Sequence, residues 1–321
     1  MEYILRIRDL VVEYAVREGR LRAVNGVSLD IPEGKITALV GESGCGKSSL
    51  LDAIMRTLPP NGYIVGGNVY FRDINLLKLS EKEFRKLRWE KIAMVFQAAQ
   101  NSFNPVLKIA DHIVETYRAH RGNVPKEKVL EKARELLEMV RLNPDQVLSS
   151  YPHELSGGMK QRALIALSLI LDPELLILDE PTSALDVYTQ SVIIDMLRKI
   201  HRERGVTMFL VTHDLPVVAE LVDYVAVMYG GKIMEVADVE TIFYRARHPY
   251  TRLLIKAIPS LIGDLSDRRP IPGEPPSLLN PPSGCVFHPR CPYRMPICEK
   301  KAPPMFNVKG SKVACWLYGE A

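Results

Sequence analysis

Apolar and polar positions alternate between strand-like and helix-like spacing along residues 1 to about 250. Residues 36–40 and 175–178 are short apolar runs of the kind that forms buried strands. Residues 207–211 form a third such run, two positions before His213. In residues 128–140, apolar side chains recur at the spacing of one helix face. The pattern predicts a large α/β domain.

The last sixty or so residues break this pattern. Twelve of the 23 prolines fall from Pro259 onward, and periodicity gives way to turn-forming residues, as in RRPIPGEPPSLLNPPSGC at 268–285. We therefore expect a domain over residues 1–255, followed by a small loop-rich appendage over 256–321. Such a segment has few apolar residues and needs an additional stabilising link, such as a bound metal or a disulfide, to stay ordered.

Composition narrows the class of protein. Of the 321 residues, 47% are hydrophobic and 25% are charged, a globular balance. The 42 basic and 38 acidic side chains leave a net charge of +4, too small to indicate a nucleic-acid partner. No uncharged apolar run reaches the length of about 18 residues that spans a bilayer, and the first ten residues lack a signal-peptide core. We expect a soluble, cytoplasmic chain that is not itself a channel.

A phosphate-binding motif follows the first apolar run. Residues 41–48 fit G-x-x-x-x-G-K-[ST] at every fixed position, and apolar residues at helical spacing follow, so a helix should begin near Lys47. Glycines let backbone N–H groups close around phosphate oxygens, and a helix N-terminus adds roughly half a positive charge. Lys47 would reach the β- and γ-phosphates, Ser48 would bind Mg²⁺, and Cys45 would only fill the loop. The predicted nucleotide and Mg²⁺ residues here are Gly41, Glu42, Ser43, Gly44, Cys45, Gly46, Lys47, Ser48 and Ser49.

Two acidic residues end the run at 175–178. Asp179 would bind Mg²⁺ through water, and Glu180 would polarise the attacking water. Two adjacent acids can also form a solvated turn, and the phosphate-binding motif favours the catalytic interpretation.

A second candidate anion site is LSGGMKQR at 155–162, which precedes a segment with helical apolar spacing. Ser156 can cap that helix, while Gly157 and Gly158 allow its amides to approach a ligand closely. An ordinary serine-capped helix is the alternative interpretation.

These segments together resemble the ATP-binding cassette (ABC) ATPases. LSGGMKQR resembles the signature motif of that family, and LLILDE at 175–180 and GESGCGKS at 41–48 resemble its Walker B and Walker A motifs. The resemblance covers about residues 4–250. It implies a RecA-like P-loop NTPase core with a helical subdomain at about 98–165.

The resemblance implies further site residues. Gln97 in MVFQ matches the Q-loop glutamine, which contacts Mg²⁺ and senses a transmembrane partner, and His213 in LVTHD matches the switch histidine at the γ-phosphate. Asp186 in SALD matches the D-loop, and Tyr14 in LVVEY resembles the aromatic residue that stacks on adenine. The catalytic set would be Glu180, His213 and Gln97.

The family pairs two such chains head to tail. Each ATP would lie between Lys47 of one chain and residues 156–158 of the other, which gives the second anion site a purpose. ATP binding would join the pair, and hydrolysis would let it part.

Four cysteines crowd the appendage: Cys285, Cys291, Cys298 and Cys315. Four thiols in a cytoplasmic protein argue against disulfides and favour a metal ion or an iron–sulfur cluster. Their spacing matches neither a zinc finger nor a ferredoxin, so it leaves zinc, a cluster and unliganded thiols open.

The appendage has its own resemblance. RHPYTRLLIKAIP at 247–259 and IPGEPPSLLNPPSGCVFHPRCPYR at 271–294 are similar to the C-terminal extension of oligopeptide/dipeptide importer ATPases. This resemblance implies a structural [4Fe–4S] cluster on the four cysteines, with zinc as the alternative.

The resulting hypothesis is the energy-coupling subunit of an importer, peripheral on the cytoplasmic side of the membrane. Its partners would be two transmembrane permeases, a second ABC ATPase and, indirectly, an extracytoplasmic solute-binding protein. Short peptides would be the cargo, with oligosaccharides or nickel as alternatives. A soluble ABC ATPase acting on nucleic acid or ribosomes is a remote alternative, because only about a hundred residues separate Ser48 from Leu155 and the chain has one cassette.

Overall fold

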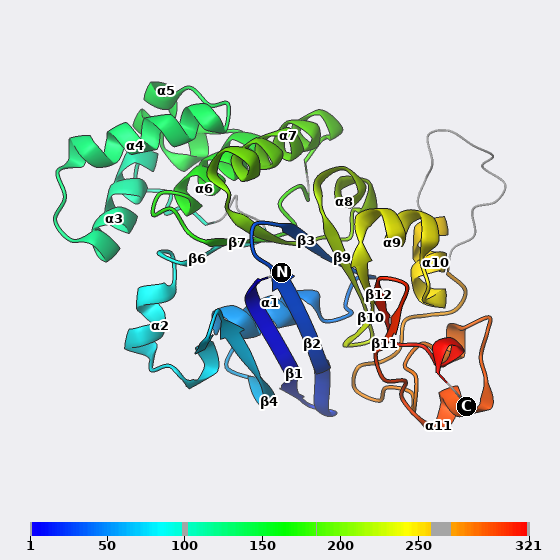
Figure 1. Ribbon diagram of the computed structural model, residues 1–321. Coiled ribbons are helices and arrows are strands. Elements are labelled where there is room, and N and C mark those ends of the chain that lie inside the picture. Colours follow the sequence, from blue (N-terminus) through cyan, green and yellow to red (C-terminus); the bar gives the residue numbers. More distant parts are fainter. Residues whose placement is uncertain (1, 98–101, 184, 258–270, 320–321) are drawn as a thin grey trace. The chain divides into compact units, whose positions relative to one another are not determined.

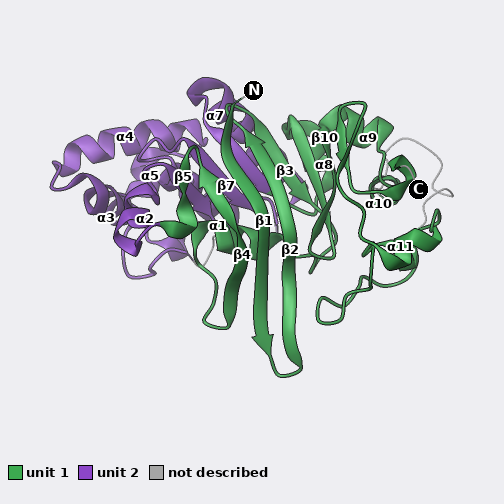
Figure 2. Ribbon diagram, turned by 60° about the horizontal axis from the view of Figure 1, so that its bottom comes forward, with its two compact units in different colours: residues 1–78, 211–321 green, residues 79–210 purple. Residues whose placement is uncertain are grey.

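The computed structural model describes residues 2–97, 102–183, 185–257 and 271–319. The chain forms two compact units (Figure 2). Unit 1 combines residues 1–78 with residues 211–321, and unit 2 is the continuous segment 79–210. The predicted domain boundaries after residue 255 and around 98–165 do not coincide with these units and stay predictions.

Unit 1 contains an antiparallel sheet with the strand order β2-β1-β4-β5. Figure 1 labels the first three of these strands, which lie side by side. Buried positions recur along its two long strands, and register shifts between these strands interrupt the alternation of buried and exposed side chains. The strands are β1 (Tyr3–Val16), β2 (Gly19–Pro32), β4 (Gly62–Phe71) and β5 (Ile74–Asn75).

A second set of strands in unit 1 carries the predicted run at 36–40. β3 (Ile36–Val40) is buried at every position and pairs in parallel with β9 (Tyr224–Tyr229). β10 (Lys232–Asp238) pairs antiparallel with β9. The appendage adds β12 (Ser311–Val313) to β10, and β11 (Phe306–Val308) to β12. The appendage therefore continues the sheet of the domain before it.

The helices of unit 1 are short. They are α1 (Lys47–Met55), α8 (Leu215–Leu221), α9 (Val239–Arg245), α10 (Pro249–Lys256) and α11 (Pro296–Lys300), with 3₁₀ turns at Leu76–Lys78, His288–Arg290 and Trp316–Tyr318.

Unit 2 joins strands to a helical region. β6 (Ile92–Val95) and β7 (Leu175–Asp179) are parallel neighbours, and β8 (Thr207–Val211) lies on the other side of β7. The helices are α2 (Glu81–Leu87), α3 (Ile109–Arg121), α4 (Lys126–Met139), α5 (Pro144–Ser149), α6 (Gly157–Ser168) and α7 (Val187–Arg204), with a 3₁₀ turn at Pro152–Glu154.

The predicted helix at 128–140 corresponds to α4. Val129, Ala133, Leu136 and Leu137 form its buried face, and α4 contacts α3, α5 and α6 (Figure 1). The α/β class predicted from the sequence is confirmed. Among the described residues, no helix has the length and apolar character needed to cross a membrane.

Candidate nucleotide site

The phosphate loop, residues 41–48, runs from β3 into the first turn of α1. Lys47 is only 6% exposed. Its Nζ donates to the carbonyl oxygens of Gly41 at 2.8 Å and Glu42 at 3.1 Å. Ser48 lies beside it in the first turn of α1 and is exposed. The lysine thus lies inside the curve of the loop that the sequence predicted to bind phosphate.

Two glycines of this loop are required by backbone packing. Gly46 has φ 106° and caps α1, and a Cβ there would lie 2.1 Å from the carbonyl oxygen of Ala23. A Cβ on Gly41 would lie 2.1 Å from the carbonyl oxygen of Met228. Any other residue would have to displace main chain at either position. The sequence explained these glycines by phosphate binding alone, whereas the fold also needs them.

Cys45 is a buried part of this loop. It is 6% exposed, and burial raises the pKa of its thiol, with the Lys47 charge opposing that effect. A protonated, enclosed thiol is a poor nucleophile. Its environment agrees with the predicted space-filling role.

Tyr14 on β1 lies next to the start of α1. Its hydroxyl donates to Oγ of Ser49 at 3.0 Å, and its ring is half-buried. The structure thus brings Tyr14 to the helix that follows Lys47 within unit 1. Stacking on adenine stays a prediction.

The predicted acidic pair ends β7 in unit 2. Asp179 is 6% exposed, and Glu180 follows with φ 47°, a left-handed conformation that turns the chain. Nε2 of Gln97 donates to Oε2 of Glu180 at 3.0 Å. The sequence predicted both residues separately, but it gave no sign of this hydrogen bond. Of the Q-loop stretch that follows, residues 98–101 lie outside the described residues.

The signature segment, residues 155–158, leads into α6. Ser156 caps this helix by accepting a hydrogen bond from the Met159 N–H at 3.3 Å, and its side chain is exposed. Gly157 and Gly158 are partly exposed. Ser156 therefore caps the helix, as the alternative interpretation of an ordinary serine-capped helix expects. The N-terminus of α6 also remains accessible to an anion.

Asp186, from the predicted D-loop, caps α7. Its carboxylate accepts hydrogen bonds from the backbone N–H of Thr189 at 2.9 Å and from the Thr189 hydroxyl at 2.7 Å. These bonds lower the pKa of Asp186. A Cβ on Gly158 would lie 2.6 Å from Cγ2 of Thr189. Thr189 thus joins the D-loop aspartate to the signature segment, a contact that the sequence reasoning missed. Ala184 of the same motif lies outside the described residues.

His213 lies between β8 and α8 in unit 1. It is exposed, and the next residue, Asp214, caps α8 by accepting from the Val217 N–H at 3.4 Å. The predicted site residues are thus divided between the units. Unit 1 holds Tyr14, residues 41–49 and His213, and unit 2 holds Gln97, residues 156–158, Asp179, Glu180 and Asp186.

The prediction of a [4Fe–4S] cluster or zinc in the appendage is wrong. In the part of the chain that the structure describes, no group of three or more His, Cys, Asp or Glu side chains is placed to hold a metal ion. Burial, aided by neighbouring cysteines, raises the pKa of Cys285 to about 11 and of Cys315 to about 12, and burial also raises the pKa of Cys291. Without a metal ion, the buried thiols of Cys285 and Cys315 are protonated at neutral pH and pack as small apolar side chains.

The appendage is ordered by contacts that the sequence did not reveal. β12 pairs with β10, and the ring of Phe287 packs against Tyr229 at 5.2 Å and Tyr250 at 5.3 Å between centroids. All three aromatic residues are almost fully buried. The appendage is therefore held by a sheet and an aromatic cluster that it shares with the preceding domain, and not by the predicted metal.

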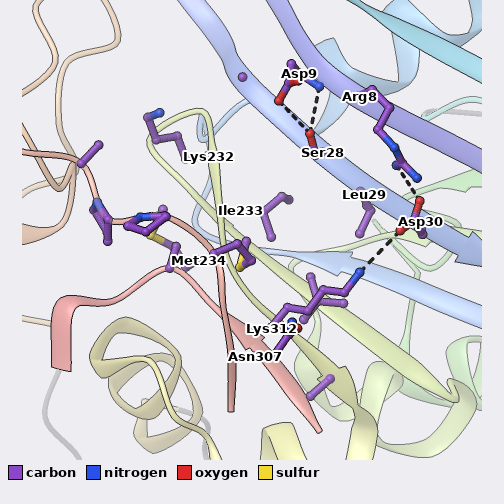
Figure 3. Close-up of a pocket in the computed structure, with 18 of the residues that line it drawn as sticks. Arg8, Asp9, Ser28, Leu29, Asp30, Lys232, Ile233, Met234, Asn307 and Lys312 are labelled. Carbon is purple, nitrogen blue, oxygen red and sulfur yellow. Dashed lines mark hydrogen bonds and ion pairs between the residues drawn. The ribbon is translucent and has the colours of Figure 1, made fainter. Parts of the chain in front are cut away.

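A cavity of about 690 Å³ in unit 1 lies apart from the predicted nucleotide residues (Figure 3). β1, β2, β10 and the appendage line it, and an ion-pair triad joins Asp30 to Arg8 at 2.6 Å and to Lys312 at 3.5 Å. Its lining includes Cys285 but no predicted nucleotide residue.

Comparison with known proteins gives two family matches. The "ABC transporter" model matches residues 24–183, and the "oligopeptide/dipeptide transporter, C-terminal region" model matches residues 234–298.

Curated relatives match over almost their whole length. A dipeptide transport ATP-binding protein, DppD, of Caldanaerobacter subterraneus subsp. tengcongensis is 53% identical over 321 residues, which cover 100% of this chain and 98% of the relative. The oligopeptide transport ATP-binding protein OppD of Bacillus subtilis is 41% identical, covering 98% and 88%.

Solved structures show the same fold. The dimeric post-hydrolysis state of the ATP-binding cassette MJ0796, bound to ADP and Pi, has a TM-score of 0.66 at 30% identity, covering 73% of this chain and 98% of that one. The structure of cbiO1 from Clostridium perfringens, part of the ABC transporter complex cbiONQ, has a TM-score of 0.65 at 28% identity, covering 76% and 92%.

These matches confirm the predicted cassette fold and its ligands, ATP and Mg²⁺. With a phosphate loop formed around Lys47 and full-length relatives at this identity, the chain belongs to the ATP-binding proteins of ABC transporters and is an ATPase.

Proposed function

We propose that this chain powers the import of short peptides as the ATP-hydrolysing subunit of an ABC transporter. It sits on the cytoplasmic side of the membrane, bound to two transmembrane permeases, and an extracytoplasmic binding protein delivers the peptide. The single observation that carries the proposal is the 53% identity to a dipeptide transport ATP-binding protein over the whole chain, the C-terminal region included.

The phosphate loop binds the nucleotide. Lys47 exchanges the carbonyl oxygens of Gly41 and Glu42 for the β- and γ-phosphates, and backbone N–H groups of residues 41–49 surround the phosphate oxygens. Tyr14 stacks on the adenine. Ser48 and Asp179 would hold Mg²⁺, and the bound ion would offset negative charge on the phosphates.

Hydrolysis depends on three residues. Glu180 accepts the proton of the attacking water, and the 3.0 Å hydrogen bond from Gln97 supports this role by fixing the carboxylate. Gln97 also carries the signal to the permease. His213, exposed before α8, contacts the γ-phosphate.

A second chain completes the site. Its Ser156, Gly157 and Gly158 bring the N-terminus of α6 to the γ-phosphate, and Asp186 holds the start of α7 beside that segment. The second chain is another copy or a sister ATPase. The nucleotide-binding domain spans 1–255, with its helical subdomain at about 98–165, and the transporter extension spans 256–321.

The test is affinity purification of the tagged chain from mildly solubilised native membranes, with its companions identified by mass spectrometry. We expect two permeases. The accompanying binding protein is then screened with short peptides, oligosaccharides and Ni²⁺, and binding of either of the last two would replace the peptide cargo. Recovery only from the soluble fraction, with ribosomes or DNA, would overturn transport and leave the ATPase activity standing.

A further inference from the structure

The C-terminal extension holds the phosphate loop by one side chain. Arg290 lies between Cys285 and Cys291, and its side chain is 5% exposed. Its Nη1 donates to Oε2 of Glu42 at 2.7 Å, and its Nη2 donates to Oε1 at 3.1 Å. Glu42 is the second residue of the phosphate loop, 248 positions earlier in the chain. This two-pronged geometry is the strongest form of a side-chain ion pair.

The same guanidinium is anchored on both sides of that pair. Nε donates to the Pro272 carbonyl at 2.8 Å and Nη2 to the Ile271 carbonyl at 3.2 Å, both within the extension. Nη1 also donates to the Tyr229 hydroxyl on β9 at 3.2 Å. Burial alone would lower the pKa of Arg290, yet the bonds to Glu42 and Tyr229 raise it. The Arg290 guanidinium therefore stays charged and is held by hydrogen bonds from all three of its nitrogen atoms.

The backbone of Glu42 is held by a second residue outside the loop. Its N–H donates to the Tyr250 hydroxyl at 3.1 Å. Tyr250 on α10 is fully buried, and its ring lies 4.5 Å from Tyr229 and 5.3 Å from Phe287. The carbonyl of Glu42 accepts from Lys47. Side chain, N–H and carbonyl of Glu42 are thus all engaged.

The contacts of Arg290 and Tyr250 with Glu42 join two regions of the chain, each of which matches a different family model. Glu42 lies in the segment 24–183 that matches the ABC transporter model. Tyr250 and Arg290 both lie in the segment 234–298 that matches the transporter C-terminal region. The extension is consequently in direct contact with the nucleotide half-site of its own chain.

The contact has a consequence for ATP binding. When Lys47 turns to the phosphates, it releases the carbonyl oxygens of Gly41 and Glu42. The loop then keeps the hydrogen bond from the Cys45 N–H to the Glu42 carbonyl at 3.3 Å but loses both bonds to the lysine. We propose that Arg290 and Tyr250 are positioning residues that keep the loop in its binding conformation through this exchange. Ordering a loop before the ligand arrives removes an entropic cost from binding. The proposal requires only the ATPase activity and is independent of the cargo.

The first test substitutes Arg290→Gln in the full chain and measures the Kd and KM for MgATP together with kcat. We expect Kd and KM to rise about tenfold, which corresponds to ~1.4 kcal/mol, while kcat changes less than about twofold because no reacting atom is touched. Partial loss of folded protein would instead lower the apparent kcat and leave KM unchanged. The conservative Arg290→Lys should recover only part of the affinity, because an ammonium cannot make the paired bonds.

The matched control is Arg294→Gln, four residues away. Arg294 pairs with Glu299 at 3.3 Å, with the two side chains 53% and 50% exposed. Exposed pairs of this kind contribute little, so ATP binding should be unchanged.

A double-mutant cycle decides whether Arg290 acts through Glu42. In a Glu42→Ala background, adding Arg290→Gln should weaken ATP binding no further, because the acceptor of the Arg290 bonds is already absent. An undiminished effect in that background, or wild-type affinity in folded Arg290→Gln, would overturn the proposal.

Should Arg290→Gln fail to fold, Tyr250→Phe tests the same grip. It removes one hydroxyl from the aromatic cluster and keeps the ring packing. We expect a severalfold rise in KM for ATP, and an unchanged KM would count against the proposal.

Discussion

The phosphate loop and the signature segment are both glycine-containing turns at a helix N-terminus, but they differ in how closely other atoms surround their glycines. In the phosphate loop, main-chain oxygens would lie 2.1 Å from an added Cβ at Gly41 or Gly46, and Lys47 is 6% exposed. In the signature segment, the obstacle at Gly158 is a threonine methyl group, and Ser156 is exposed. Main chain cannot yield at the first site, whereas a side chain can yield at the second.

This difference separates the two predicted anion sites. The phosphate loop is assembled within one chain, with its lysine, its glycines and Glu42 already held. The signature segment offers helix amides outward and has little of its own around them. It therefore suits a site that is completed from elsewhere, in agreement with the proposed head-to-tail pairing.

The largest effect should come from Gly46→Ala. The added Cβ meets the Ala23 carbonyl at φ 106°, so ATP binding should be lost and unfolding in urea should show a destabilisation of more than about 3 kcal/mol. Gly44→Ala is the matched control, since its φ is 75° but its Cβ meets nothing within 4 Å. It should cost only ~1 kcal/mol, and equal losses in both variants would remove the distinction drawn from backbone contact.

Glu180→Gln should divide binding from chemistry. We expect ATP affinity to be retained and kcat to fall about 10²- to 10⁴-fold, the range for removing a general base. Lys47→Ala is the counterpart in unit 1 and should weaken nucleotide binding itself. Hydrolysis by Glu180→Gln at the wild-type rate would refute the catalytic assignment.

Gly158→Ala should have a smaller and repairable effect. Its Cβ meets Cγ2 of Thr189 at 2.6 Å, so we expect ATPase activity to fall about three- to tenfold, or ~1 kcal/mol, with ATP affinity for the single chain unchanged. Thr189→Ser removes that methyl, keeps the hydroxyl that Asp186 accepts from, and should restore activity in the double variant. Failure of this rescue would show that the glycine is needed for ligand approach instead.

The smallest effect is a pH dependence at Asp186. Hydrogen bonds from Thr189 lower the folded-state pKa of this exposed carboxyl below its ordinary 3.8. The helix cap therefore stabilises the fold above that value, and the contribution is lost as pH falls through the lower folded-state pKa. Thermal unfolding of wild type and Asp186→Asn should differ at pH 7, and the difference should shrink as the pH falls below 3.8. A constant difference across this range would exclude ionisation as the cause.

Local patterns in the sequence were sufficient to predict the strand, helix start and helix cap that carry the predicted nucleotide residues. The run at 36–40 is β3 with the predicted bounds, the helix predicted near Lys47 begins there, and Ser156 caps α6. Each of these features depends on neighbours within a few residues, such as a strand feeding a turn or a side chain capping its own helix. Periodicity and capping rules describe that range.

Contacts between distant segments were beyond such rules. Gln97 and Glu180 are 83 positions apart, and Glu42 and Arg290 are 248 apart. Arg290 lies in a proline-rich stretch where a cation is expected to be exposed, and no periodic pattern marks it. Its burial arises from the sheet and aromatic cluster that enclose it.

The cysteines failed as a signal for a different reason. Their number and crowding suggested ligands, but spacing does not distinguish a thiolate facing a metal from a thiol that fills space. Cys285 and Cys315 are buried, and among the described residues no group of side chains is placed to hold a metal ion, so the second description applies.

The grip on Glu42 also sets an order for biosynthesis. The ribosome makes residues 41–48 early, whereas Tyr250 and Arg290 emerge some two hundred residues later. Unit 2 is continuous and can close first, as domains do during synthesis, while unit 1 must wait for its second segment. A chain that stops before Arg290 would carry an intact Walker A motif without the partner of its glutamate. The proposed positioning of the phosphate loop by Arg290 can therefore begin only after residue 290 has been made.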